Sequence, residues 1–177
     1  MDHLASTPRL SLRLWTLADT EAALALWGDP EVMRFVESPL TPDQAHRTII
    51  AGQRVWEAHG VQHFAVCLAQ GGEIIGCSGF NPFSEPETLE FVTHFMPHAW
   101  GKGYAQEAGE AALDWARQTH PSKGIIASTH QANVHAQGLL RRLGFKQEGE
   151  RFWEDVQAYE PFFRLPQAPP GAPSTGR

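Results

Sequence analysis

The sequence predicts an α/β (α+β) fold: one domain with a central mixed, mostly antiparallel sheet of about seven strands and helices on both faces of the sheet. Three observations support this prediction. The length of 177 residues suits one domain with a single core. Strand-like runs and capped helical segments follow one another in the order β-α-α-β-β-β-α-β-α-β-β. Residues 166–177 hold four prolines and two glycines without a large apolar side chain. We therefore place the domain at residues 1–166 and predict a disordered tail at 167–177.

The first third of the chain is predicted to contain one strand and the first helices. Residues 9–14 alternate with period two, as in a half-buried strand. Asp19 is the expected N-cap of a short helix, and Asp29-Pro30 restarts a helical turn with a capping side chain followed by proline. Thr41-Pro42-Asp43-Gln44 is a capping box. The long helix that it begins is expected to end at Gly60.

Three strands are predicted next, at residues 62–68, 73–79 and 88–95, because these runs are apolar and bounded by turn residues. Gly71-Gly72 is a hairpin turn between the first two. Residues 82–86 are expected to form a loop. The remaining predicted elements are a helix at 105–118, a strand at 123–128, a helix between Asn133 and Gly144, and strands near 145–153 and 157–165.

The composition excludes several classes of protein. The net charge is −6 and no long basic stripe is present, which argues against a nucleic-acid partner. No stretch of about 18 apolar residues exists, so we expect no membrane-spanning helix. The first residues lack the basic start and apolar stretch of a signal peptide, and we expect a cytoplasmic location. Cys67 and Cys77 lie in strand-like runs and are expected to be reduced core residues.

The histidines do not form a recognisable metal motif. His94 and His98 are separated by a strand end and a proline, and His130 and His135 by a helix start. Neither pair has two histidines on one helix face beside a carboxylate. We therefore expect no metal.

The run Trp100-Gly101-Lys102-Gly103-Tyr104-Ala105 lies between a predicted strand and a predicted helix. Its glycines let the backbone turn tightly and approach an anion, and Lys102 adds a cation. The helix start contributes unpaired N–H groups and roughly half a positive charge. An ordinary strand-to-helix turn also fits Gly-x-Gly. A dinucleotide motif needs a third glycine where Gln106 stands, and a P-loop needs Gly-Lys-Ser or Gly-Lys-Thr. The run therefore predicts a different pyrophosphate site.

Two spaced motifs extend this run. Residues 90–108 read EFVTHFMPHAWGKGYAQEA, with an acidic strand residue, a proline and an acidic helix start around the glycines. Residues 133–145 begin with NVHA and end with RRLGF. Together with RLSLR at 9–13, DPEVM at 29–33 and IIG at 74–76, they resemble the GNAT N-acetyltransferase superfamily, and within it the RimJ/RimL-like branch. The resemblance covers about residues 8–165 and implies a GNAT-type single domain that uses acetyl-coenzyme A as co-substrate.

The resemblance also implies how the cofactor binds. The pyrophosphate would be held at the run that includes Trp100 and Lys102, by the backbone amides of Gly101, Gly103, Tyr104 and Ala105. Phe95 and Met96, at the splayed end of a strand, would bond the pantetheine arm. Asn133 would contact the arm from the opposite strand and cap its helix. Arg142, with Arg141 and Lys146, would offset the phosphates, although a solvated helix face explains these arginines equally well.

Glu90 is the candidate general base, acting directly or through water, with a strand-end salt bridge as the alternative. His94 shares its strand face and is the second candidate. The chain departs from the family pattern where Ala136 replaces the usual serine, where Leu139-Leu140 lacks a tyrosine, and where Phe163 stands in place of tyrosine. The usual Gly-Tyr is Val92-Thr93. The donor of a proton to the leaving thiolate is therefore not identified.

The chemistry favours a weakly basic acceptor. An α-amine of pKa near 7.8 is made neutral at pH 7 at a cost of about 1 kcal/mol, whereas a lysine amine costs about 4.6 kcal/mol. Three functions remain open: acetylation of a protein N-terminus, acetylation of a small amine, and a coenzyme A-binding sensor without catalysis. Residues 19–59 and the last hairpin are expected to select the acceptor. A C-terminal edge strand would allow a homodimer.

Overall fold

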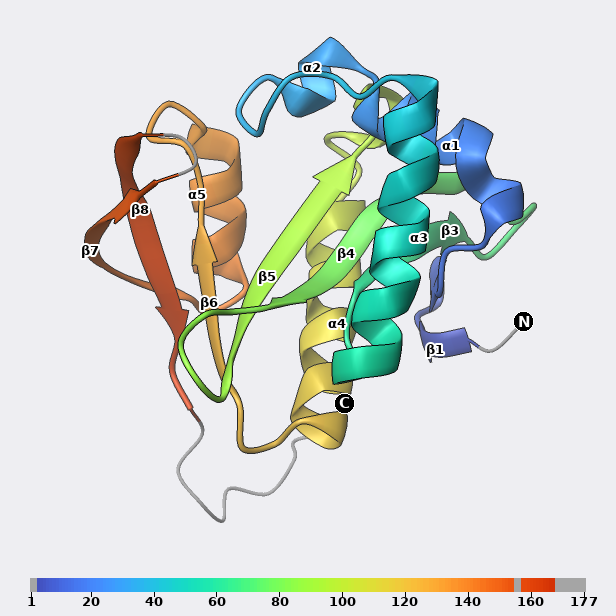
Figure 1. Cartoon of the computed structure of the whole chain (residues 1–177). Helices are drawn as coiled ribbons and strands as arrows, with labels where there is room; N and C mark the ends of the chain where they lie inside the picture. Colours follow the sequence, from blue (N-terminus) through green and yellow to red (C-terminus); the bar gives the residue numbers. More distant parts are fainter. Residues whose placement is uncertain (1–2, 155–156, 168–177) are drawn as a thin grey trace.

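The computed structural model describes residues 3–154 and 157–167. Eight strands form one sheet in the order β1-β2-β3-β4-β5-β6-β8-β7, and every neighbouring pair is antiparallel except β5 and β6, which are parallel (Figure 1). The strands are β1 (His3–Ser6), β2 (Leu10–Arg13), β3 (His63–Leu68), β4 (Ile74–Pro82), β5 (Thr88–Phe95), β6 (Gly124–Ser128), β7 (Lys146–Trp153) and β8 (Ala158–Leu165). The predicted fold class is confirmed.

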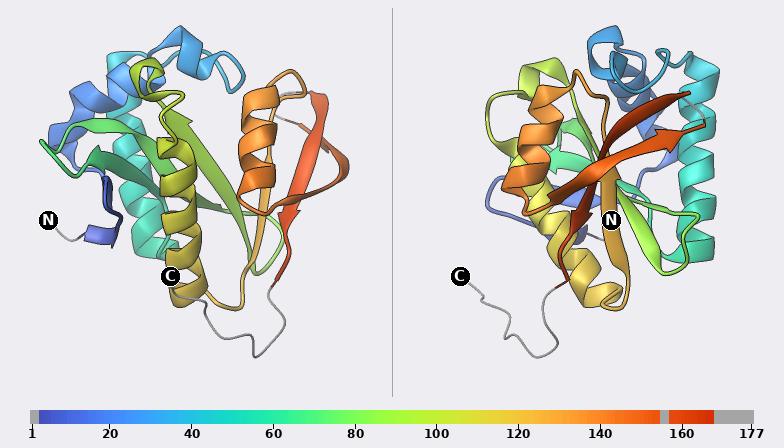
Figure 2. Two further views of the ribbon diagram at one scale, coloured as in Figure 1. Left: turned by 180° about the vertical axis from the view of Figure 1, so that it is seen from behind. Right: turned by 90° about the vertical axis from the view of Figure 1, so that its left-hand side faces the viewer.

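Helices cover both faces of the sheet (Figure 2). One face carries α1 (Thr20–Trp27) and α3 (Pro42–His59), with the single turn α2 (Pro30–Met33) beside α1. The other face carries α4 (Tyr104–Thr119) and α5 (Val134–Arg142). Two short 3-10 turns, η1 (Leu17–Asp19) and η2 (Pro97–Ala99), precede α1 and α4. Within the described residues, no helix is both long enough and apolar enough to cross a bilayer.

Most helix boundaries follow the predicted capping signals. Thr41 and Gln44 form the expected capping box, with the Thr41 N–H donating to Gln44 Oε1 at 2.8 Å. Gly60 ends α3 in the left-handed region, with φ of +67°. Gly144 ends α5 at φ of +92°, and its N–H bonds the Arg141 carbonyl while the next N–H bonds that of Leu140.

The structure corrects the prediction in three places. The sheet has an additional strand, β1, which is only four residues long and forms by pairing with the edge of β2, so no periodic pattern marks it. β4 continues beyond Gly79 into the expected loop and ends at Pro82, which pairs with Leu89 of β5. Asp19 directly precedes α1 as expected, but its carboxylate does not cap that helix. Apart from Gln167, the predicted tail lies outside the described residues.

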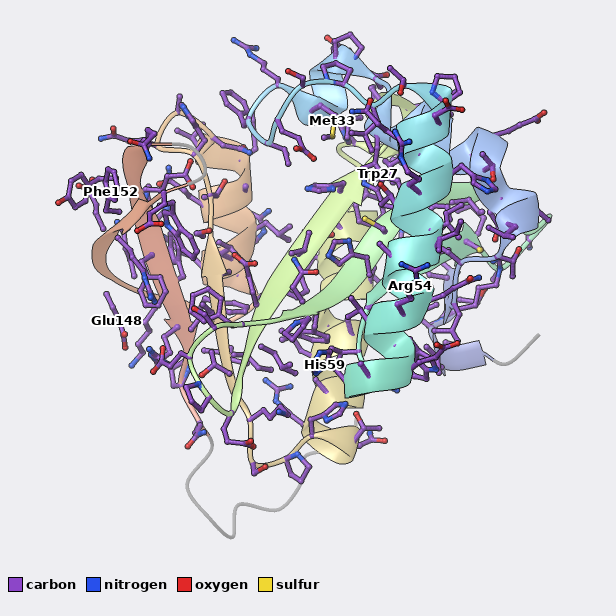
Figure 3. All side chains as sticks on the ribbon, viewed as in Figure 1. Trp27, Met33, Arg54, His59, Glu148 and Phe152 are labelled. Atoms are coloured by element: carbon purple, nitrogen blue, oxygen red, sulfur yellow. The ribbon has the colours of Figure 1, made fainter. Side chains whose placement is uncertain are left out.

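Two apolar clusters lie on opposite faces of the sheet. On the face covered by α4, Trp115 of this helix packs edge-on against Phe64 of β3, with ring centroids 4.8 Å apart. On the other face, Trp27 and Met33 lie where α1 and α2 meet the sheet (Figure 3). Cys67 and Cys77 belong to this second cluster as free, buried thiols, as predicted, and burial raises the pKa of Cys77 to about 12.

At the far edge of the sheet, Glu148 and Phe152 lie on β7, which is exposed along most of its length (Figure 3). The last strand of the chain, β8, lies between β6 and β7 and is not the expected edge strand; the edge at this end of the sheet is β7. The homodimer stays a prediction.

A buried ion pair joins β2 to the first helical segment. The Arg13 guanidinium donates to Asp19 through both terminal nitrogens, at 2.8 and 2.9 Å, and Asp19 also accepts from the Thr16 N–H. The two side chains are only 10% and 12% exposed. Arg13→Met leaves a carboxylate buried without its cation, and we expect it to lower the free energy of unfolding by about 3 kcal/mol. Urea denaturation at pH 7 measures this loss.

The same ion pair makes the free energy of unfolding depend on pH in the acid range. Burial raises the pKa of Asp19, but hydrogen bonds from Arg13 and Thr16 outweigh burial, so the net pKa lies below its ordinary value. The contribution is therefore fully present above the unfolded pKa and is lost as the pH falls through the lowered pKa. Asp19→Asn is expected to lose this part of the acid dependence. An unfolding curve whose acid dependence is the same in wild type and Asp19→Asn would exclude the pair as its source.

Candidate active site

The site begins where β5 and β6 separate. Their parallel ladder has three paired positions, Thr88 with Gly124, Leu89 with Ile125 and Glu90 with Ile126. Beyond Glu90, β5 follows β4 to Phe95 while β6 follows β8, so the two strands diverge in a V (Figure 1). The predicted splay at the end of this strand is therefore present. Along the open side of β5, backbone groups lose their strand neighbour and become available to an extended ligand.

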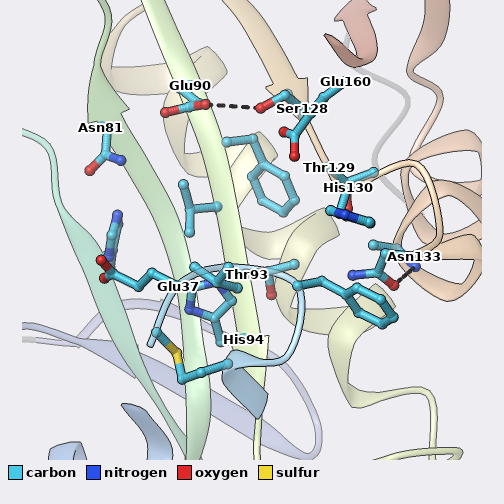
Figure 4. Close-up of a pocket in the computed structure, with 18 of the residues that line it drawn as sticks. Glu37, Asn81, Glu90, Thr93, His94, Ser128, Thr129, His130, Asn133 and Glu160 are labelled. Atoms are coloured by element: carbon cyan, nitrogen blue, oxygen red, sulfur yellow. Dashed lines mark hydrogen bonds between the residues drawn. The ribbon is translucent and has the colours of Figure 1, made fainter. Parts of the chain in front are cut away.

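A cavity of about 400 Å³ opens at this V (Figure 4). β5, β6, the loop from β6 to α5, α5 itself and the segment between α2 and α3 contribute to its lining, together with single residues from α1, α2, α3, β3, β4, β7 and β8. Its polar lining residues are Glu37, Thr48, His63, Asn81, Glu90, Thr93, His94, Ser128, Thr129, His130, Asn133 and Glu160. No lysine or arginine belongs to the lining in the described part of the chain, so the titratable groups there are carboxyl and imidazole groups.

Glu90 lies at the vertex of the V, and the Ser128 hydroxyl donates to its Oε1 at 3.4 Å (Figure 4). Glu160 extends from β8 toward Ser128 and the Glu90 side of the cavity (Figure 4). The structure thus brings together both predicted base candidates, since His94 also lines the cavity. Sequence reasoning missed Ser128 and Glu160. Both follow from strand pairing, because Ser128 pairs with Phe162, two positions from Glu160.

His94 has a defined tautomer. Its Nδ1 accepts a hydrogen bond from the Trp27 indole N–H at 3.2 Å, so the proton of the neutral ring is on Nε2. Burial and, to a smaller extent, the neighbouring His63 together lower the pKa of His94 to about 4. Burial also lowers the pKa of His63, opposed by a hydrogen bond with Asn81. His94 is therefore a neutral, weakly basic group at neutral pH.

This assignment gives a direct spectroscopic expectation. The imidazole resonances of His94 should stay constant between pH 5.5 and 8, because a group with pKa of about 4 does not titrate there. A midpoint for His94 near pH 6.5 would show that the ring is protonated in the folded protein and would restore it as a base.

The glycine run has the backbone that the anion cradle requires. Gly101 and Gly103 have φ of +71° and +79°, in the region that favours glycine. Gly103 is the N-cap of α4 and supplies no side-chain cap. The first N–H groups of α4, from Tyr104, Ala105 and Gln106, therefore lack an intrahelical acceptor and point out of the helix start. Lys102 is exposed beside them.

The end of β5 is already engaged within the protein. The Trp100 indole N–H donates to the Phe95 carbonyl at 2.6 Å, and the Met96 N–H donates to the Ile75 carbonyl at 2.9 Å. Phe95 keeps a second lone pair for the pantetheine arm, whereas the Met96 N–H faces β4. The contact of Phe95 with the arm stays a prediction that this geometry accommodates. A contact through the Met96 N–H would require its bond to Ile75 to open.

The other predicted cofactor residues lie on α5. Asn133 caps the helix as expected, its Oδ1 accepting from the Ala136 N–H at 3.1 Å, and it lines the cavity (Figure 4). Arg142 is exposed on the outer face of the helix. Arg141 donates to Gln137 and Gln147 at 3.5 and 3.0 Å. These positions match a solvated helix face, and a role toward phosphate stays a prediction for Arg142.

Within the described residues, no group of three or more histidine, cysteine or carboxylate side chains is placed to hold a metal ion.

Comparison with known proteins identifies the class of this fold and site. Residues 9–146 match the family model of the acetyltransferase (GNAT) domain. The chain belongs to the GNAT acetyltransferase family and is an acyltransferase. The family uses acetyl-coenzyme A.

Sequence relatives match most of the chain. It is 28% identical over 146 residues to the uncharacterized N-acetyltransferase p20 of Bacillus licheniformis, covering 81% of this chain and 82% of that protein. It is 30% identical over 134 residues to the uncharacterized protein YkkB of Bacillus subtilis (strain 168), covering 72% and 78%.

Solved structures share the fold. A GNAT-family acetyltransferase from Bacillus anthracis superposes with a TM-score of 0.78 at 22% identity, covering 90% of this chain and 95% of that one. RimL, a ribosomal L7/L12 alpha-N-protein acetyltransferase solved in complex with coenzyme A, has a TM-score of 0.77 at 14% identity, covering 92% and 96%. At these identities the superpositions establish the fold alone.

Proposed function

We propose that this chain transfers the acetyl group of acetyl-coenzyme A directly to a primary amine, and that the acceptor is the α-amine of a protein N-terminus. One observation carries the proposal: the V between β5 and β6 joins a cavity with Glu90 at its vertex, and the strand that forms one side of the V leads into the glycine cradle at α4. The residues fit coenzyme A, since an anion site and an open strand edge lie on one continuous segment.

The residues have separate roles in this mechanism. Coenzyme A supplies the activated thioester. The amides of Gly101, Gly103, Tyr104 and Ala105 bind the pyrophosphate, with Lys102 and Trp100 in the same loop, and the open edge at Phe95 orients the arm with Asn133 opposite. Glu90 takes the proton from the attacking nitrogen, directly or through water, as the new C–N bond forms and the C–S bond breaks. The departing thiolate then takes a proton from water, and the proton held by Glu90 returns to solvent.

The charge of the cavity supports an amine acceptor. Glu37, Glu90 and Glu160 line it, and the described lining contains neither lysine nor arginine. Carboxylates attract an ammonium group, and Glu90 is the group placed to deprotonate it. His94 accepts the Trp27 indole N–H at Nδ1 and carries its proton on Nε2, so neither ring nitrogen is free to take a proton, and it serves as a neutral neighbour of the amine. Since the described lining offers carboxylates rather than a strong base, an α-amine suits the site better than a lysine amine.

A small-molecule amine is the second candidate, favoured by the aromatic walls of the cavity. Trp27, Phe35 and Trp153 line it, and Phe35 stacks on His130 with ring centroids 5.4 Å apart. Such walls would enclose a compact ligand more completely than a peptide.

A thiol-release assay with matched acceptors separates these functions. A short peptide with a free N-terminus is expected to release coenzyme A faster than the same peptide with a blocked N-terminus and one lysine. A small amine that outperforms every peptide would favour the second candidate. Release from neither class, despite coenzyme A binding, would overturn the acetyltransferase proposal in favour of a sensor.

A further inference from the structure

A cluster of side chains from segments far apart in the sequence lies against the glycine cradle. Arg9, just before β2, and Glu107, in the first turn of α4, are 98 positions apart, and the Arg9 Nε donates to Glu107 Oε2 at 2.6 Å. The Arg9 backbone N–H reaches Glu107 Oε1 at 3.3 Å, and the Thr7 hydroxyl donates to the same oxygen. Glu107 thus has both carboxylate oxygens bound by the N-terminal segment.

The same arginine also holds the loop before the helix. Arg9 Nη1 donates to the Lys102 carbonyl at 3.0 Å, and its guanidinium lies 4.7 Å from the centroid of the Tyr104 ring. A Cβ atom placed on Gly103 would meet Arg9 Nη2 at 3.5 Å. One planar group therefore contacts the carbonyl between the two glycines, the side chain of the first helical residue and the carboxylate of the first turn.

The charge of Glu107 makes this arrangement informative. A carboxylate in the first turn of a helix competes with a bound anion for the positive end of the helix dipole. Burial raises the pKa of Glu107, but hydrogen bonds from Thr7 and Arg9 outweigh burial, so the group stays ionised at neutral pH. Because this negative charge weakens anion binding at the helix start, its presence there needs a compensating effect. The geometry indicates that this effect is to fix the conformation of the loop before α4.

We propose that Arg9 and Glu107 are positioning residues that hold the Gly101–Gly103 loop in its phosphate-binding conformation, and so determine the affinity for the phosphates of coenzyme A. The inference rests on the proposed function, because it assumes that these phosphates bind at the cradle. Neither residue touches the acetyl group or the amine in this account. Their loss should raise the KM of acetyl-coenzyme A and leave kcat at saturation unchanged.

Glu107→Gln distinguishes positioning from simple charge. The variant removes a negative charge beside an anion site, so electrostatics alone predicts tighter binding. A positioning role predicts the opposite, because the amide cannot replace both charge-assisted bonds to Arg9, and the Kd of coenzyme A should rise about tenfold. Arg9→Lys keeps the cation but loses the fork that reaches Lys102 and Glu107 together, and it should behave as Arg9→Met does.

Calorimetry with two probes provides the test. Coenzyme A carries the phosphates, whereas pantetheine presents the arm without them, so the variants should weaken coenzyme A and leave pantetheine unchanged. Asp114→Asn is the matched control, because it breaks the exposed Asp114–Arg117 pair on the same helix away from the cradle. It should bind both probes as the wild type does.

Three results would contradict the positioning role of Arg9 and Glu107. Tighter or unchanged binding of coenzyme A by Glu107→Gln would overturn the positioning role, as would wild-type affinity in Arg9→Lys. Equal weakening of both probes would indicate a general loss of structure and would also overturn it. A wild-type protein that binds pantetheine and coenzyme A equally would instead overturn the phosphate site of the proposed function, and this inference with it.

Discussion

Gly103→Val should raise the KM of acetyl-coenzyme A by about 10- to 100-fold, with little change in kcat at saturation. Gly103 has φ of +79°, and a β-branched residue at such a φ is strained by more than the 1–2 kcal/mol typical of left-handed backbone. Its side chain would also meet Arg9. The loop would therefore relax to another conformation, and the amides of the cradle would no longer converge on one anion. Initial rates over a range of acetyl-coenzyme A concentrations measure the change.

Gly71→Val is the matched control for backbone strain. Gly71 has φ of +83° in the turn between β3 and β4, and a Cβ there meets nothing within 4 Å. The two variants thus have a similar backbone penalty, but only one alters the cradle. A KM that rises equally in both variants would attribute the effect to stability and would remove Gly103 from the cofactor site.

Glu90→Gln should lower kcat by about 10²- to 10⁴-fold, which is the range for loss of a general base. The amide keeps the shape of the side chain and the hydrogen bond with Ser128, so the loss reports proton transfer rather than packing. The pH profile of kcat should also lose the limb that belongs to the base. The limb that reports ionisation of the free amine should remain in kcat/KM.

Glu37→Gln separates this effect from the general charge of the cavity. Glu37 lines the same cavity from the segment between α2 and α3 and is exposed. Its loss should raise the KM of a cationic acceptor without reshaping the pH profile of kcat. An unchanged pH profile in Glu90→Gln would exclude Glu90 as the base and leave water-mediated deprotonation at another group.

Short sequence patterns predicted the parts of the site that depend on the backbone conformation of a few neighbouring residues. Gly101 and Gly103 have the left-handed backbone conformation expected of glycines in this run. Asn133 caps α5, as its position before an amphipathic segment predicts. Capping boxes and glycine stops act within one turn, so the sequence contains all the information that they need. The family resemblance added the order of the motifs and the splay of β5.

Contacts between distant segments could not be predicted in the same way. Glu160 reaches the cavity through the register of β8 on β6, and Arg9 reaches Glu107 across the sheet edge. The same holds for Asp19, whose carboxylate binds Arg13 instead of the helix start, because a buried cation nearby outweighs a cap. Strand pairing and side-chain choice among partners depend on the assembled sheet, which no short sequence pattern encodes.

Acetylation of an amine at the cavity of the V is tested most directly by incubating the protein with acetyl-coenzyme A and a short peptide, followed by mass spectrometry. The peptide is expected to gain the mass of one acetyl group at its N-terminal residue, and Glu90→Gln is expected to slow this gain while coenzyme A binding is kept. Tight binding of coenzyme A without an acetylated product from peptides or small amines would contradict the proposed acetyltransferase activity.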